Sequence, residues 1–303
     1  MDGTEKKLSQ SQWNLIFLIL AVAVGSLLYR LIARGRLEQT GLLFIGIPSV
    51  LAIFLTMTPK AKNVVGAIVK GITLFLLLSG PLLGEGFVCI VMAAPLFYAV
   101  GILVGVLIDS SRKKRKATLT CLVLLLTPMS FEGVSPRLSF NREQAVSASE
   151  VVNAPALEVE RALSRSPRTD LPLPYYLRMG FPRPTETHGT GLEIGATRTI
   201  HFAGGEGHPG DLIVQVEESR PGYVRFAAVA DHSKIAHWLD WKGSEVRWYA
   251  IDSQHTRVTW TLSFTRRLDP AWYFAPWESY AAHLGAEYLI KANATPSASE
   301  RAR

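Results

Sequence analysis

Apolar residues follow two different patterns along the chain. Up to residue 131 they form long runs that charged residues seldom interrupt. After residue 143 the runs are short, and apolar residues either alternate with polar ones or recur every three to four positions. The first pattern is typical of membrane-spanning helices and the second of a water-soluble α+β domain. The sequence therefore predicts two domains of different kinds.

Five apolar runs in the first half predict a transmembrane bundle of about five helices, since one spanning helix needs about 20 residues. The predicted spans are residues 13–33, 41–58, 64–80, 86–108 and 117–131. The last run would form a helix only about 22 Å long. It is therefore several residues shorter than a helix that spans a hydrocarbon core of about 30 Å. Snorkelling basic side chains and local bilayer thinning can close such a gap. Lys70 lies inside the third run, and we expect it to snorkel toward the basic end at Lys60–Lys62.

Basic residues set the predicted orientation of the bundle. The positive-inside rule favours a cytoplasmic N-terminus, which places on the cytoplasmic face Lys6, Lys7, Lys60, Lys62 and the run Arg112–Lys116. The predicted localisation is therefore the cell membrane, with several passes. If 117–131 crosses the bilayer, which we favour, the C-terminal domain is extracytoplasmic. If that segment lies in the interface, the domain is cytoplasmic.

Composition and charge narrow the function further. Residues 1–143 carry 15 Lys/Arg and 7 Asp/Glu, whereas the rest of the chain carries 17 and 18. Basic residues that flank apolar runs suit lipid headgroups. The second half has no basic surplus and no nucleic-acid motif, so we expect no nucleic-acid partner. The first half has no histidine and no acidic residue deep in a run, which favours an anchor over a transporter.

The second half predicts an α+β domain at residues 144–292, after a linker at 132–143 and before a disordered tail at 293–303. A strand at 144–153 and a helix from Pro155 to Ser164 precede a proline-rich connection at 165–191, with one short helix at 175–179. The later strands are predicted at 196–203, 211–218, 223–230, 245–251 and 257–265. A long helix at 270–292 carries one stripe made of Trp277, Tyr280, Leu284 and Tyr288.

This order of elements resembles a known superfamily. The segments ASEVVNAPALEVERAL, GTGLEIGATRTIHF and TRVTWTLSF, followed by an aromatic terminal helix, look like the START-like helix-grip (SRPBCC) superfamily. That superfamily includes the polyketide cyclase/dehydrase and lipid-transport group, and the likeness is greatest to membrane-tethered bacterial members. The resemblance covers residues 144–292 and implies a curved antiparallel sheet wrapped on the last helix, around a mostly apolar cavity. Members use the cavity for lipids, sterols, polyketides or hormones, and the fold alone assigns no activity.

Arg198 is the most suggestive candidate for ligand contact. It shares strand parity with Ile200 and Phe202, so it faces the cavity if they do. A buried guanidinium needs a partner, and a ligand carboxylate or phosphate would supply bidentate hydrogen bonds. The alternative is a structural salt bridge to Glu217 or Glu193.

Aromatic and histidine residues complete the predicted ligand-binding set. Tryptophan beside histidine in DHSKIAHWLDW suits a cavity mouth. His283 and Glu287 are four residues apart on the last helix, so they form either a general base pair or a surface pair. The tryptophans either hold the ligand or simply fill the core. The full set is Arg198, His237, Trp248, Trp260, Trp277, Tyr280 and His283.

Metal and cofactor chemistry are not expected. HFAGGEGHPGD brings together His201, Glu206, His208 and Asp211, but their spacing fits no zinc site and the glycines favour a hairpin turn. GTGLEIG lacks the spacing of a dinucleotide fingerprint. We predict neither a metal nor a cofactor. The two cysteines, Cys89 and Cys121, lie in apolar runs and suit packing.

These observations predict a membrane-anchored binding protein that holds a hydrophobic small molecule or lipid beside the bilayer. One alternative is a cyclase- or dehydratase-like enzyme for an apolar carbonyl substrate, which would need an acid or base inside the cavity. Another is a regulatory module without a ligand. Cavity volume separates the regulatory module from the other two possibilities, because a cavity below about 300 Å³ leaves little room for a drug-sized ligand. The sequence gives no indication of oligomeric state.

Overall fold

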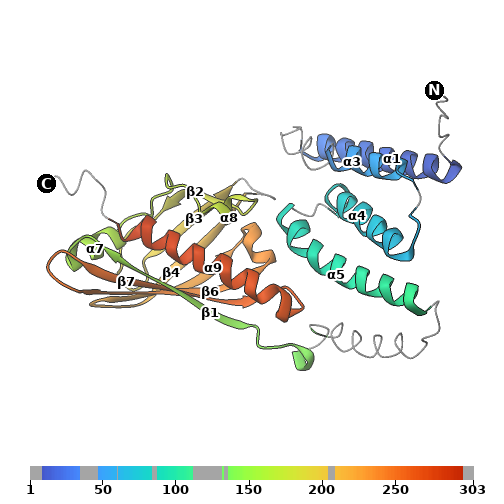
Figure 1. Cartoon of the computed structure of the whole chain (residues 1–303). Coiled ribbons are helices and arrows are strands. Elements are labelled where there is room, and N and C mark those ends of the chain that lie inside the picture. The colour runs from blue at the N-terminus through green and yellow to red at the C-terminus, as the bar shows by residue number, and fades with distance from the viewer. Residues whose placement is uncertain are drawn as a thin grey trace. The chain divides into compact units, whose positions relative to one another are not determined.

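The computed structural model describes residues 9–34, 47–59, 61–83, 87–111, 132, 136–203 and 209–295. The chain divides into two compact units, Met1–Thr127 and Pro128–Arg303. Figure 1 shows the first as helices and the second as a sheet with helices. Each unit is described separately below.

Four helices are described in the N-terminal unit, and each packs on a neighbour in the chain. Their bounds are α1 (Gln10–Arg34), α3 (Ile47–Met57), α4 (Val64–Leu83) and α5 (Phe87–Ser111). Helices α4 and α5 approach closely at Gly105, where an added Cβ would lie 2.9 Å from the Cα of Val65. The hydroxyls of Thr73 and Tyr98 form a 2.7 Å hydrogen bond across the same pair of helices. Small residues and hydroxyl pairs of this kind hold apolar helices together.

Large apolar side chains of this unit point outward. Among the most exposed are Phe17, Leu18, Phe54, Phe75 and Val106. By length and composition, one described segment, Val88–Asp109, is sufficient to cross a membrane, and the other apolar helices are shorter. Residues 117–131, the fifth predicted span, lie outside the described residues. The five-span bundle stays a prediction.

Lys70 points toward the connection between α3 and α4, which is the direction expected from the sequence. Its ammonium donates a 3.1 Å hydrogen bond to the carbonyl of Thr58, just after the last residue of α3. The side chain therefore extends back along α4 toward the polar connection between α3 and α4. This is the direction in which a lysine inside an apolar helix snorkels.

The C-terminal unit is built on one seven-stranded antiparallel sheet in the order β1-β7-β6-β5-β4-β3-β2. The strands are β1 (Glu143–Val152), β2 (Arg183–His188), β3 (Thr197–Ala203), β4 (Gly210–Arg220), β5 (Tyr223–Asp231), β6 (Leu239–Ala250) and β7 (Thr256–Arg266). The helices are η2 (Pro136–Leu138), α7 (Ala156–Leu163), α8 (Tyr175–Arg178), η3 (Lys234–His237) and α9 (Ala271–Asn293). The first strand pairs with the last strand, β7, and α9 follows β7.

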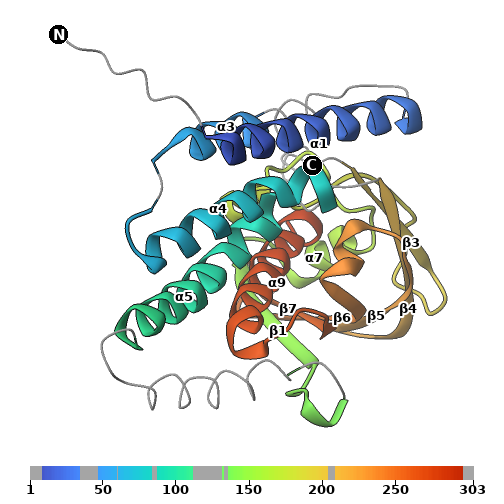
Figure 2. The ribbon, with the colours of Figure 1, turned by 90° about the vertical axis from the view of Figure 1, so that its right-hand side faces the viewer.

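The sheet curls around α9, as Figure 2 shows. Strand β7 alternates buried and half-buried residues, with Val258, Trp260, Leu262 and Phe264 on the face that contributes to the core. Helix α9 packs against β1 and β7, and its Ala286 and Ile290 are fully buried in the same core. This is the helix-grip arrangement, so the predicted strand, helix, meander and terminal helix are confirmed.

Three details differ from the sequence prediction. Strand β2 lies inside the connection predicted to be irregular, where its edge position and a bulge after Pro184 accommodate the proline. Strand β6 begins at Leu239, six residues earlier than expected. The tail was predicted to begin at residue 293, but Asn293 and Ala294 are 4% and 0% exposed. Residues 296–303 of that tail lie outside the described part of the chain.

Candidate functional site

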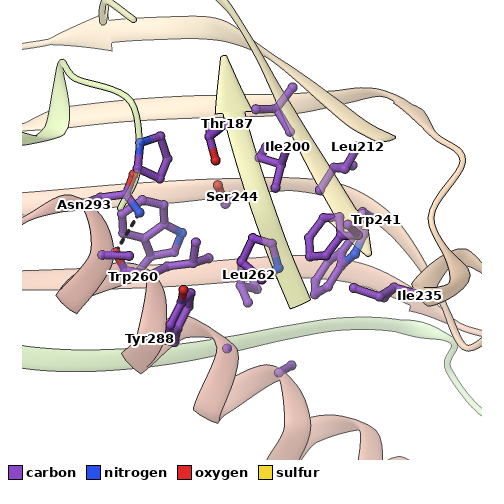
Figure 3. Close-up of a pocket in the computed structure, with 18 of the residues that line it drawn as sticks. Thr187, Ile200, Leu212, Ile235, Trp241, Ser244, Trp260, Leu262, Tyr288 and Asn293 are labelled. Carbon is purple, nitrogen blue, oxygen red and sulfur yellow. Dashed lines mark hydrogen bonds between the residues drawn. The ribbon is translucent and has the colours of Figure 1, made fainter. Parts of the chain in front are cut away.

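A cavity of about 200 Å³ lies between the concave face of the sheet and α9 (Figure 3). Its walls come from β2 to β7, from α8 and η3, and from the second half of α9. Helix α9 contributes small side chains here, among them Ala281, Ala282 and Gly285. A Cβ on Gly285 would lie 3.7 Å from the Cδ1 of Leu262. The space exists because one face of α9 carries side chains too short to reach the sheet.

The two ends of the cavity differ in chemistry. Figure 3 places Asn293, Trp260 and Tyr288 toward one end, and Ile235 and Trp241 toward the other. The first end thus lies near the last turns of α9, and the second near η3 and the start of β6. A ligand with one polar and one apolar end would match this division.

Four buried polar atoms in the cavity lining have no hydrogen-bond partner within the described residues. They are Thr187 Oγ1, Arg198 Nε, Trp260 Nε1 and Asn293 Oδ1. Buried polar groups almost always have a partner, which can be protein, water or ligand. These four unpartnered atoms, from β2, β3, β7 and α9, thus belong to residues that line one cavity.

Arg198 is held in place by backbone carbonyls. It is 3% exposed, and its Nη2 donates to the carbonyls of Leu163, at the end of α7, and of Gly191. The guanidinium carbon lies 4.9 Å from the centroid of the Phe226 ring. A cation suits the C-terminal carbonyls of a helix and the face of an aromatic ring. The side chain is therefore oriented by structure, while its Nε remains free of any described partner.

Arg198 has no ion-pair partner among the described residues. Glu217 instead pairs with Arg225, at 3.2 Å between Oε2 and Nε. Desolvation lowers the pKa of Arg198 to about 10, although the charge of Glu193 opposes that shift. The salt bridge considered from the sequence is thus not formed with either glutamate. A buried, unpaired guanidinium favours an anion or a strong acceptor at this position.

The cavity offers few groups for acid–base chemistry. Among the lining residues that the structure describes, the titratable side chains are Arg168, Arg198 and Tyr288. Burial raises the pKa of Tyr288, and its hydroxyl donates to the carbonyl of Leu171 at 3.5 Å. No cluster of three potential metal ligands occurs in the described ranges.

The predicted site residues separate into two groups. Arg198 and Trp260 line the cavity, and Trp260 is 3% exposed. Trp248 is buried in the core and lies outside the cavity lining, so it fills the core, which was the alternative to ligand contact. For His237 the structure describes the backbone in η3 but not the side chain.

The expected stripe on α9 does not face the cavity as a whole. Of its residues only Tyr288 contributes to the lining, and Tyr280 is 51% exposed. Trp277 contacts the Tyr273 ring instead, at 6.3 Å between centroids. The cavity face of α9 is rotated toward its alanines and Gly285, because these small residues leave the space. Trp277 and Tyr280, two of the predicted ligand-binding residues, therefore lie outside the described lining, whereas Tyr288 of the same stripe belongs to it.

The two histidine hypotheses have different outcomes. His283 lies 3.3 Å from Glu287, as the helical spacing predicted, but both are partly exposed and outside the cavity lining. The other ring nitrogen of His283, Nδ1, lies 3.0 Å from the carbonyl oxygen of Ser147. His201 Nδ1 and Asp211 Oδ1 are 2.6 Å apart on the paired strands β3 and β4. Residues 204–208, including Glu206 and His208, lie outside the described residues.

Two lining residues were missed by the sequence analysis. Thr187 lies on β2, within the stretch predicted as a loop, and Asn293 lies at the point where a tail was predicted. The stretch Arg183–His188 shows no alternation of apolar and polar residues and has prolines at 182 and 184, so no local pattern indicated the strand. Asn293 carries no local signal, since its position depends on where α9 ends against the sheet.

Comparison with known proteins adds the following. No protein-family model and no curated protein matches the chain. The Zhui aromatase/cyclase from Streptomyces sp. R1128 is 15% identical, with a TM-score of 0.30 over 50% of this chain and 86% of its own. A START superfamily protein from Mycobacterium smegmatis is 14% identical, with a TM-score of 0.35 over 49% and 92%. Norcoclaurine synthase from Thalictrum flavum is 8% identical, with a TM-score of 0.32 over 49% and 96%. At these values the likeness does not tell what this chain binds.

Proposed function

We propose that the protein is a membrane-anchored binding protein for a small hydrophobic molecule with one hydrogen-bond-accepting head. The observation that carries this proposal is the pair of unpartnered donors, Arg198 Nε and Trp260 Nε1, in an otherwise apolar cavity. Leaving a buried donor without a partner costs about 1–3 kcal/mol. A bound acceptor removes that cost, and the apolar walls hold the rest of the ligand.

The cavity volume limits the size of the ligand. At about 200 Å³ it is below the roughly 300 Å³ at which drug-sized pockets begin, so the criterion set from the sequence counts against a drug-sized ligand and in favour of the regulatory module. It is above the about 150 Å³ that is sufficient for benzene in an apolar cavity. The proposed ligand is therefore one aromatic ring with a short substituent, or a short acyl chain. A sterol, a multi-ring polyketide or a complete phospholipid would require the walls to move.

The polar end of the cavity limits the chemistry of the head. Arg198, with a pKa of about 10, carries its charge at neutral pH and favours a carboxylate. Trp260 Nε1 is a second donor, whereas Asn293 Oδ1 is an acceptor. A carboxylate or carbonyl oxygen suits the two donors, and a hydroxyl on the ligand suits Asn293.

The membrane part of the proposal is supported by the N-terminal unit. Its helices expose phenylalanine, leucine and valine side chains, and in the sequence basic residues flank the apolar runs. Such a surface is stable in lipid but costly in water. On this proposal the chain is a multi-pass protein of the cell membrane. The C-terminal domain is extracytoplasmic if residues 117–131 cross and cytoplasmic if they do not.

The experiment is to identify small molecules that co-purify with the full chain in mild detergent. Wild type, Arg198→Met and Arg247→Met are purified in parallel, and their organic extracts are compared by mass spectrometry. Arg247 is the matched control, because it is an arginine on β6 whose side chain is 64% exposed. We expect one small acid or carbonyl compound in wild type and in Arg247→Met, depleted about tenfold or more in Arg198→Met.

Two results would contradict the proposal. A compound present equally in all three proteins would remove Arg198 from recognition. Wild type that remains empty from several growth conditions would favour the regulatory module without a ligand. The cyclase-like enzyme lacks support at present, because the described lining contains no carboxylate or imidazole.

A further inference from the structure

The junction before the sheet is fixed rather than flexible. Glu132 comes one residue after the apolar sequence 117–131, and its side chain is 6% exposed. Its Oε1 accepts a hydrogen bond from Arg266 Nη2 at 3.3 Å and from the amide of Ala271 at 3.0 Å. Ala271 is the first residue of α9, where a carboxylate is favoured by the helix dipole. Glu132 is thus attached to the body of the domain.

Arg266 extends this attachment to the neighbouring residues. It is fully buried, and besides Glu132 it donates to Asp269, at 2.7 Å, and to the carbonyls of Phe140 and Asn141. Arg142 pairs with the other carboxylate oxygen of Asp269. The predicted linker at 132–143 is therefore held at both ends, and it cannot act as a long tether.

Exposed apolar side chains surround this junction. Leu138, Phe140 and Trp272 are 54%, 66% and 49% exposed. Phe140 is tied to Arg266 through its carbonyl, and Trp272 follows the residue that binds Glu132. The ring of Trp272 leads into a chain of ring contacts along the first turns of α9, through Tyr273 to Phe274 and Trp277. Tryptophan and tyrosine are enriched where proteins meet the membrane–water interface.

We propose that this face, made of Leu138, Phe140 and Trp272, rests in the headgroup region of the same bilayer that the anchor enters. The proposal rests on the membrane anchoring proposed above. An apolar segment that ends one residue before a fixed point leaves no chain with which to lift the domain away. The bilayer is therefore the surface that covers these side chains, and the exposed Arg137 beside them suits lipid phosphates.

This placement also orients the cavity. Leu239, which lines the apolar end, is the sheet partner of Arg266. Arg267 donates to the carbonyl of Ala236 in η3 at 3.0 Å, next to the lining residue Ile235. The apolar end of the cavity thus lies at the face proposed to contact the bilayer. The end at Asn293, Trp260 and Tyr288 lies away from it, so a ligand would enter from the membrane with its head inward.

The test is site-directed spin labelling of the full chain in vesicles of phosphatidylcholine with a minority of phosphatidylglycerol. Cys89→Ala and Cys121→Ala remove the native thiols. Single cysteines then replace Leu138, Phe140 or Trp272, and the control sites are Leu157 and Tyr249, which are 59% and 56% exposed elsewhere on the domain. Val106 on α5, 47% exposed, reports on the anchor itself. Exposed positions tolerate the change, and tryptophan fluorescence checks folding.

The readout is the accessibility of each label to oxygen, which prefers lipid, and to a water-soluble nickel chelate. We expect oxygen to dominate at the three face positions and at Val106, and the nickel chelate to dominate at Leu157 and Tyr249. Labels on the face that are accessible to nickel, while Val106 remains in lipid, would overturn this inference but keep the anchor. Nickel access at Val106 as well would overturn the anchor. Oxygen dominance at the control sites would show that the face is not specific.

Discussion

Two buried arginines mark two regions of the C-terminal domain with opposite character. Arg266, at the junction, donates to five oxygens, two of them on the carboxylates of Glu132 and Asp269. Arg198, in the cavity, donates to two carbonyls through one nitrogen, and its Nε has no described partner. Both are at most 3% exposed. Burial alone therefore does not distinguish a structural arginine from a binding one.

The difference lies in how completely each guanidinium is satisfied. A guanidinium has five N–H donors, and at Arg266 the protein supplies an acceptor for each. At Arg198 the protein fixes the orientation and leaves Nε without a described partner, in a residue that lines an apolar cavity. A guanidinium whose N–H groups all have acceptors in the protein stabilises the fold. One with a free N–H group is stabilised by a bound acceptor. The same residue type thus serves the fold in one place and recognition in the other.

The largest expected effect is on stability at the junction. Arg266→Met removes the cation between two largely buried carboxylates, and losing one partner of such a cluster costs about 3–5 kcal/mol. The free energy of unfolding is measured by denaturant titration of the full chain in detergent, followed by tryptophan fluorescence. Six of the seven tryptophans lie after residue 187, so the signal reports on this domain.

The matched control is again Arg247→Met, whose surface pair with Glu245 is worth at most about 1 kcal/mol. Equal stability of Arg266→Met and Arg247→Met would contradict the structural role. Adding Glu132→Gln and Asp269→Asn to Arg266→Met should recover part of the loss, because no buried charge is then left unpaired.

The next effect concerns a buried carboxyl beside the same cluster. Desolvation raises the pKa of Glu278 to about 7, against the opposing charge of Arg266, and its side chain is 4% exposed. The folded protein therefore keeps a proton that the unfolded chain loses above its ordinary pKa of 4.5. The free energy of unfolding should fall by about 3 kcal/mol as pH rises from below 4.5 through 7.

Glu278→Gln should remove that fall and exceed wild type in stability at alkaline pH. Denaturant titrations at a series of pH values measure it. If the free energy of unfolding of Glu278→Gln falls by the same amount as pH rises, another group causes the pH dependence.

The smallest effect on stability is expected at the cavity. Arg198→Met removes the hydrogen bonds to Leu163 and Gly191 but leaves no carboxylate unpaired, so a loss of about 1–2 kcal/mol is expected. The same denaturant titration measures it. A loss as large as that of Arg266→Met would place Arg198 with the structural arginines, and the contrast between the two regions would fail.

The sequence anticipated part of the site. The parity of β3 correctly placed Arg198 on the inner face, and the alternation of β7 did the same for Trp260. On α9 the sequence analysis selected the aromatic stripe, whereas the cavity is lined mainly by alanines and Gly285. It also missed Thr187 and Asn293, because neither a proline-rich edge strand nor the last turn of a helix has a strong local pattern.

By itself the sequence determined the α+β class of the C-terminal domain and the order of its main helices and of its strands apart from β2, because hydrophobic periodicity reflects which faces are buried. Tertiary structure alone decided which donors remain unsatisfied. Arg198 and Arg266 are the same residue type on inner strands, and they differ only in the oxygens that distant segments bring to them. Glu132 reaches Arg266 from 134 positions away in the sequence, and Leu163 reaches Arg198 from 35 positions away. Hydrogen bonding acts over a few ångströms between residues far apart in sequence, so no local pattern encodes it.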